Sequence, residues 1–162
     1  MASNERRNGP SWRSKRFVNN SRPLLIIEDS HEDYELVTSV LATSGITQPI
    51  YRLVIGSDTL DYLNRRMGHQ KHEDEPLPSL ILLDLHLPAA NGLDVLREIK
   101  TSARFRNIPV VVMSTSARQL DIQSCYSAGA NSYIVKSIDT PLYLHKIKVM
   151  ADYWLNCVEF PE

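Results

Sequence analysis

Long apolar runs and cysteines are scarce in this chain of 162 residues. No stretch approaches the roughly 18 consecutive apolar residues that a membrane-spanning helix needs, and no signal-peptide pattern opens the sequence. The two cysteines, Cys125 and Cys157, fall in helical patterns, which favours reduced, packed thiols over a disulfide framework. These features predict a cytoplasmic protein that does not enter a membrane.

Charge is distributed unevenly along the chain. Residues 1–22 contain six basic side chains and one acidic one, so the remainder holds 12 basic and 18 acidic residues, a formal charge of −6. We expect a basic, disordered tail at 1–22, one folded domain at 23–157 and a C-terminal extension at 158–162. The tail could instead contact an acidic partner. An acidic body argues against a nucleic-acid-binding surface.

The apolar stretch at 79–83 is followed directly by a carboxylate, Asp84. The stretch is too short for a core helix and is typical of a strand buried on both faces. In open α/β sheets, ligands bind outside the carboxyl ends of the strands, so Asp84 would be presented to a ligand or a reaction. Capping of the next turn is the ordinary alternative for such an aspartate taken alone.

Strand and helix patterns alternate along the body of the chain. Besides 79–83, strands are expected at 24–27, 50–54, 109–113 and 132–135, and helices at 32–44, 57–66, 92–102, 118–129 and 139–156. This alternation predicts an α/β fold, a doubly wound five-stranded parallel sheet of flavodoxin-like type with helices on both faces. The polar loop at 68–78 contains His69 and His72, but without further soft ligands the pair does not predict a metal site.

Polar side chains follow four of these strands. They are Glu28 and Asp29 after the first, Asp84 after the third, Ser114 after the fourth and Lys136 after the fifth. Parallel strands bring these ends to one rim, where three carboxylates repel one another unless a hard cation such as Mg²⁺ binds them. The lysine and the hydroxyl suit an incoming anion. Each residue alone has an ordinary structural role, but the set predicts a carboxylate that accepts a phosphoryl group.

Residues 24–156 resemble the receiver domains of two-component response regulators. The resemblance rests on 26–29, on 82–88 with Gly92, on 112–114 and on 133–136. It implies that Asp84 accepts a phosphoryl group from a histidine kinase. It also implies that Asp29 binds Mg²⁺ directly, that Glu28 acts through water, and that the main-chain carbonyl of His86 is another ligand.

The same resemblance assigns roles to three further residues. Lys136 would pair with the phosphoryl oxygens, and Ser114 would move to hydrogen-bond them, which lets Tyr133 turn inward as a switch. Finer features at 68–78, 113–116, 133–137 and 153–155 are similar to the cyanobacterial phytochrome-partner response regulators. This similarity implies a bacterial phytochrome histidine kinase as the donor and a role in light signalling.

Two positions depart from the common receiver pattern. Lys136 is usually followed by a proline in a cis peptide, whereas Ser137 stands here, so we predict a trans bond or a loop reshaped around it. The residue after Ser114 is usually small, whereas Thr115 is β-branched. We predict that Thr115 crowds the phosphoryl pocket and slows attack by water or small donors.

No DNA-binding pattern follows the receiver-like region, so the expected output is protein contact. We predict a homodimer through the last strand and helix, with Tyr143, Ile147, Tyr153 and Phe160 as candidate interface residues. The protein would not be an enzyme beyond self-catalysed phosphotransfer and autodephosphorylation. A pseudo-receiver, an interaction module without chemistry, is the main alternative. A haloacid-dehalogenase-type phosphatase would need a second aspartate where His86 stands.

Overall fold

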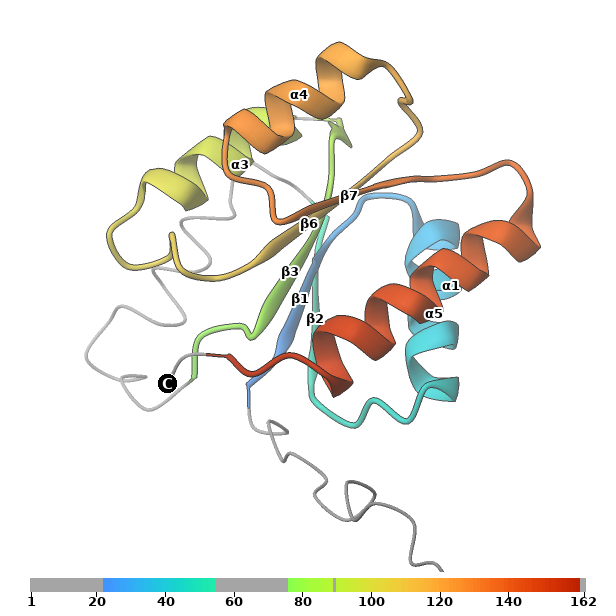
Figure 1. Ribbon diagram of the computed structural model, residues 1–162. Helices are drawn as coiled ribbons and strands as arrows, with labels where there is room; N and C mark the ends of the chain where they lie inside the picture. Colours follow the sequence, from blue (N-terminus) through green and yellow to red (C-terminus); the bar gives the residue numbers. More distant parts are fainter. Residues whose placement is uncertain (1–21, 55–75, 89, 161–162) are drawn as a thin grey trace, which may run out of the picture.

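The computed structural model describes residues 22–54, 76–88 and 90–160. Its main sheet is parallel and five-stranded, in the order β2-β1-β3-β6-β7 (Figure 1). The strands are β1 (Leu24–Ile27), β2 (Ile50–Leu53), β3 (Leu80–Asp84), β6 (Val110–Ser114) and β7 (Ser132–Val135). This order is that of the flavodoxin-like doubly wound fold, so the predicted fold class is confirmed.

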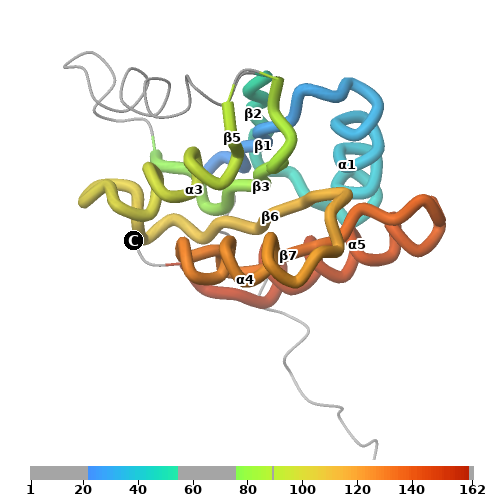
Figure 2. The backbone as a smooth tube through the Cα atoms, turned by 90° about the horizontal axis from the view of Figure 1, so that it is seen from above, coloured from blue at the N-terminus to red at the C-terminus, as the bar shows by residue number. Residues whose placement is uncertain are grey.

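Four helices in the described ranges cover the two faces of the sheet. α1 (His31–Thr43) and α5 (Thr140–Asn156) lie on one face, and α3 (Gly92–Thr101) and α4 (Gln119–Ser127) lie on the other (Figures 1 and 2). The helix expected at 57–66, the residues His69 and His72, and residues 1–21 of the tail expected at 1–22 fall outside the described residues. Within the described ranges, no helix combines the length and apolar character needed to cross a membrane.

The three inner strands are buried along their whole length, as their continuous apolar sequences predicted. Alternate side chains point to opposite faces. Leu25 and Ile27 pack in the cluster beneath α3 and α4, whereas Leu24 and Ile26 pack beneath α1 and α5. The outer strands β2 and β7 are only half-buried. The sheet is therefore packed on both faces, against α3 and α4 on one side and α1 and α5 on the other, and this packing fixes the positions of its strand ends.

Local signals set the helix ends. α1 begins at the cap residue Ser30, whose hydroxyl accepts a hydrogen bond from the backbone N–H of Asp33. Gly45 and Gly129 follow α1 and α4 with positive φ angles of 73° and 98°, a conformation that favours glycine. Gly45 lies just beyond the end expected for the helix at 32–44, and Gly129 is the last residue expected for the helix at 118–129, which ends at Ser127 in the structure.

Two expectations about side chains on α5 and beyond it are wrong. Tyr143 and Ile147 are 3% and 0% exposed, because they face the core between α5 and the sheet. They cannot form the predicted interface in the folded domain. Cys157 is exposed rather than packed, although both cysteines are free thiols, as expected. The peptide bond between Lys136 and Ser137 is trans as predicted, since the described residues contain no cis peptide.

Candidate functional site

The strand register brings the predicted polar residues to one rim of the sheet. Ile27 pairs with Leu83, so Glu28 and Asp84 follow at the same level on neighbouring strands. On the next strands, Ser114 is the last residue of β6, and the backbone N–H of Lys136 bonds to its carbonyl at 2.8 Å. All four strand-end positions singled out in the sequence therefore belong to one site.

Three carboxylates form a compact acidic group at this rim. One oxygen from each of Glu28, Asp29 and Asp84 lies within 4.8 Å of the others. Glu28 and Asp84 are buried, and Asp29 is half-buried. Hard oxygen ligands at this spacing fit a divalent cation such as Mg²⁺ or Mn²⁺.

Lys136 reaches this acidic group from the end of β7. Its Nζ lies 2.8 Å from Glu28 Oε2, 2.7 Å from Asp33 Oδ2 and 2.8 Å from Asp84 Oδ2. Each of the three ammonium protons is thus directed to a different carboxylate. The lysine side chain is only 6% exposed, so its ammonium balances the negative charge of the carboxylates within the protein rather than in the solvent.

Burial and charge act against each other on these groups. Burial alone would lower the pKa of Lys136, but its hydrogen bonds to Asp33, Asp84 and Glu28 outweigh burial and raise that pKa above its usual value. Burial raises the pKa of the Glu28 carboxyl, and the nearby lysine offsets this only in part. The lysine is therefore charged, and burial makes the Glu28 carboxyl easier to protonate than an ordinary glutamic acid.

Asp33 is a member of the site that the sequence reasoning missed. It stands in the first turn of α1 rather than at a strand end, yet its carboxylate makes one of the contacts to Lys136. The available signal was its spacing of three residues from the cap Ser30, which places it on the turn directly above the strand ends. The rim therefore combines four carboxylates with one ammonium.

Comparison with known proteins agrees with this geometry. The family model for the response regulator receiver domain matches residues 24–148. The chain belongs to the response regulator receiver domain family. Response regulator Rcp1 of Synechocystis sp. is 35% identical over 143 residues, which cover 88% of this chain and 95% of the relative. The probable methanogenesis regulatory protein FilR2 of Methanothrix harundinacea is 36% identical over 133 residues, or 82% and 83% of the two chains.

Solved structures extend the comparison to three dimensions. The phosphorylated cyanobacterial phytochrome response regulator RcpA is 33% identical with a TM-score of 0.77, and Mn²⁺-bound Rcp1 is 35% identical with a TM-score of 0.78. Each match covers 87% of this chain and 99% of the other. The predicted similarity to cyanobacterial phytochrome response regulators is therefore confirmed. The receiver belongs to two-component signalling.

In this receiver, each carboxylate oxygen of Asp84 accepts a hydrogen bond. The main-chain N–H of His86 donates to Asp84 Oδ1 at 3.0 Å, while Lys136 donates to Oδ2. The imidazole of His86 is 61% exposed, and its Nδ1 lies 3.9 Å from the same carboxylate and 3.4 Å from the Ser114 hydroxyl. A short antiparallel pair, β4 (His86–Leu87) with β5 (Ala90–Asn91), shapes the loop beyond Asp84 and had not been predicted.

Gly92 allows this loop to fold back against the strand. Its N–H donates to the carbonyl of Leu85 at 3.1 Å, which brings the start of α3 onto the end of β3. A Cβ atom at Gly92 would collide with the backbone of Asp84 and Leu85. The absence of a side chain at this position therefore lets α3 begin close to Asp84.

Tyr133 is tied to the loop that follows β6 in the receiver. Its hydroxyl donates to the main-chain carbonyl of Ser116 at 2.9 Å, and the Ser116 hydroxyl donates to Asp121. Arg118 donates to both oxygens of the same aspartate. Together, the Ser116 hydrogen bond and the Arg118 guanidinium lower the pKa of Asp121. The predicted switch residue thus contacts the segment leading from Ser114 to α4.

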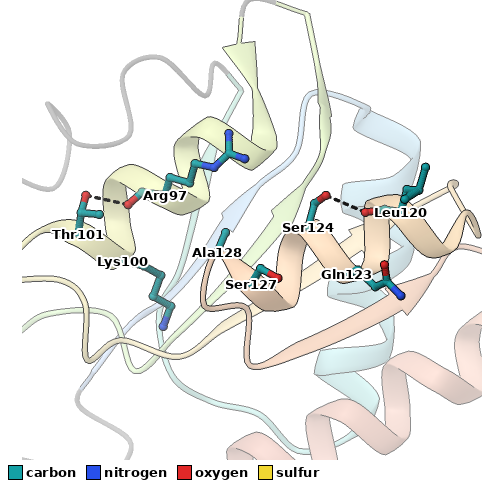
Figure 3. A pocket seen from close by; sticks show the side chains of 8 residues that line it. All are labelled: Arg97, Lys100, Thr101, Leu120, Gln123, Ser124, Ser127 and Ala128. Carbon is teal, nitrogen blue, oxygen red and sulfur yellow. Dashed lines mark hydrogen bonds between the residues drawn. The ribbon is translucent and has the colours of Figure 1, made fainter.

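A groove of about 600 Å³ between α3 and α4 lies apart from these carboxylates (Figure 3). The two cationic side chains that line it, Arg97 and Lys100, already have partners within the protein. Arg97 pairs with Asp94 at 2.8 Å, and the Lys100 ammonium donates to the carbonyls of Arg106 and Ile108 and to Asn131. The hydroxyls of Thr101 and Ser124 donate to carbonyls of their own helices (Figure 3). The groove offers no free charge with which to bind a ligand.

Proposed function

We propose that this receiver accepts a phosphoryl group on Asp84 from a phosphohistidine of a histidine kinase, in the presence of Mg²⁺. The observation that carries the proposal is the position of Asp84 between a metal-type group of carboxylates and the Lys136 ammonium. A carboxylate becomes a phosphoryl acceptor when the charge on the transferring group is neutralised from both sides.

In the proposed transfer, an oxygen of Asp84 forms the new O–P bond. The P–N bond of the donor histidine breaks, and its electron pair stays on the imidazole nitrogen, which is protonated as it leaves. Glu28, Asp29 and Asp84, with the main-chain carbonyl of His86, would hold Mg²⁺. The cation supplies charge neutralisation at the phosphoryl oxygens.

The receiver's own residues stabilise the product on its other side. Lys136 redirects an N–H from Asp84 to a phosphoryl oxygen, and the Ser114 hydroxyl moves to donate to another. This movement displaces the loop that carries Ser116, and with it the carbonyl to which Tyr133 donates. Tyr133 then turns inward, and the surface of α4, β7 and α5 changes.

We propose a phytochrome-type histidine kinase as the donor and a role in light signalling. The support is the similarity to RcpA and Rcp1, together with a 35% identical match to the bacteriophytochrome response regulator RtBRR, which has a TM-score of 0.67. Labelling by an autophosphorylated phytochrome kinase should exceed labelling by an unrelated histidine kinase at equal concentration. Equal rates from both kinases would remove the support for this donor.

The test of phosphoryl acceptance uses acetyl phosphate and a histidine kinase as donors, with and without Mg²⁺. We expect labelling that depends on Mg²⁺ and disappears in Asp84→Asn. Asp152→Asn is the matched control, because it removes an exposed carboxylate of α5 that contacts only Lys148 and Asn156 of the same helix within the described residues, and it should label normally. Absence of labelling from either donor would favour the pseudo-receiver alternative.

We also propose that the output surface forms a homodimer through β7 and α5. A groove of about 570 Å³ lies between them, and Val149 and Tyr153 beside it are 53% and 57% exposed. Tyr153 packs edge-on against Trp154 at 5.4 Å between ring centres, which presents a continuous aromatic surface. β7 is also the outermost strand on this side of the described sheet.

Size-exclusion chromatography with light scattering tests the dimer. Tyr153→Asp and Phe160→Asp should give monomers, because each buries a charge in the proposed contact. Val54→Asp is the control, since Val54 is similarly exposed, at 48%, but follows β2 at the opposite edge of the sheet. A dimer that survives both α5-side variants would exclude this interface.

A further inference from the structure

Arg52, on β2, makes an unusual set of contacts with the loop that carries the acidic pair. Its Nε donates to the main-chain carbonyl of Glu28 at 3.0 Å, and its Nη2 donates to the carbonyl of Asp29 at 2.9 Å. The guanidinium lies over the ring of Tyr34 in α1, 4.6 Å from the ring centre. The planar guanidinium thus donates hydrogen bonds to two successive peptide groups of the β1–α1 loop.

The side chains of this acidic pair are fixed to different degrees. Glu28 accepts hydrogen bonds from Lys136 and from the N–H of Ser30. By contrast, the Asp29 carboxylate accepts no hydrogen bond within the described part of the chain. Its direction therefore depends on the peptide that carries it, and Arg52 holds the carbonyl of that peptide.

We propose that Arg52 is a positioning residue for the divalent-cation site, acting through the main chain of Glu28 and Asp29. Two of its nitrogens donate to carbonyls and Nη1 lies 3.4 Å from His31 Nδ1, so the guanidinium orients the ligands without occupying a carboxylate oxygen that a cation would use. Its positive charge opposes cation binding, whereas its positioning favours it. The inference rests on the divalent-cation binding proposed above, and these opposite signs make it testable.

The test is Mn²⁺ binding to the full chain, followed by electron paramagnetic resonance of the free ion, with Mg²⁺ added as competitor. Arg52→Lys keeps the charge but cannot donate to both carbonyls in one plane, and Arg52→Met removes both charge and donors. We expect about tenfold weaker binding in Arg52→Lys, the lower end of the range for outer-shell partners of metal ligands, and a smaller loss in Arg52→Met, which also removes the opposing charge. Arg97→Lys, a surface guanidinium paired with Asp94, is the control and should bind like the wild type.

Phosphorylation gives a second readout. Arg52→Lys should raise the Mg²⁺ concentration needed for half-maximal labelling by about tenfold and leave the rate at saturating Mg²⁺ unchanged. If Arg52 had only a structural role, its replacement would lower the urea midpoint of the metal-free protein. It would not raise the Mg²⁺ requirement while leaving the rate at saturating Mg²⁺ unchanged. Tighter binding in Arg52→Met, or unchanged binding in Arg52→Lys, would overturn the inference. Failure of the wild type itself to bind Mn²⁺ would instead refute the proposed function.

Discussion

Replacing Lys136 with methionine tests the charge balance of the rim most directly. The substitution keeps the length and apolar stem of the side chain but removes an ammonium that contacts three carboxylates. Two of the partners, Glu28 and Asp84, are 0% and 7% exposed at the side chain, so water cannot replace the lost partner. Removing one member of a buried ion pair destabilises a protein by about 3–5 kcal/mol.

Proton uptake limits this loss and makes it depend on pH. Burial already raises the pKa of Glu28, and removal of the lysine raises it further. An acid whose folded pKa lies above its unfolded value lowers stability progressively as pH rises between the two. The free energy of unfolding of the variant should therefore fall further below that of the wild type as pH rises above the unfolded pKa of a glutamic acid, about 4.3. The wild-type contribution of Lys136 persists below its unfolded pKa of about 10.4 and is lost only as pH rises through its still higher folded value.

Urea unfolding at pH 5 and pH 8 measures these effects. With a urea m value of about 1–3 kcal/mol/M, a loss near 3 kcal/mol lowers the midpoint by about 1–3 M at pH 8. Mg²⁺ should restore part of the loss, since a cation at 100 times its dissociation constant contributes about 2.7 kcal/mol. Lys148→Met is the control, because it breaks only an exposed pair with Asp152. A midpoint change below about 0.3 M, or equal at both pH values, would refute the reasoning.

Three further substitutions probe the loops around Asp84. Gly92→Ala should lower stability by about 1–3 kcal/mol in urea and reduce phosphoryl labelling, because its Cβ would push the backbone of Asp84 away from α3; normal labelling would contradict this. Thr115→Ala should lose its phosphoryl group faster than the wild type, measured as decay of the labelled protein; an unchanged or slower decay would argue against crowding by Thr115. Tyr133→Phe should lose about 1 kcal/mol in urea with its hydrogen bond to Ser116, and an unchanged midpoint would mean that this bond contributes nothing.

The strand-end residues could be predicted because they depend on a simple geometric rule. Apolar runs such as 80–83 and 110–113 identify strands buried on both faces, and parallel register then places their last residues side by side. Asp84, Ser114 and Lys136 were found in this way without knowledge of strand order. The family resemblance added their roles.

The remaining features depend on packing between elements distant in sequence. Asp33 belongs to the rim because α1 starts at Ser30 and directs its first turn toward Lys136, over one hundred residues later in the chain. Arg52 reaches the β1–α1 loop only because β2 pairs with β1. Tyr143 and Ile147 share the periodicity of an amphipathic helix with exposed apolar residues, and only the packing of α5 against the sheet decides which of them is buried. Local patterns contain none of this information.

The contacts of Lys136 also suggest why Asp33 belongs to the rim. Asp84 is held by a main-chain N–H at Oδ1 and by the lysine at Oδ2, and of these two donors only the lysine is on a flexible side chain. When Asp84 carries a phosphoryl group as proposed, Lys136 must give up its Asp84 bond, while Glu28 is drawn toward the cation. Of the three carboxylates that contact Lys136 among the described residues, Asp33 is then the one that can retain the ammonium at the rim. We therefore expect Asp33 to keep the lysine in place throughout the transfer.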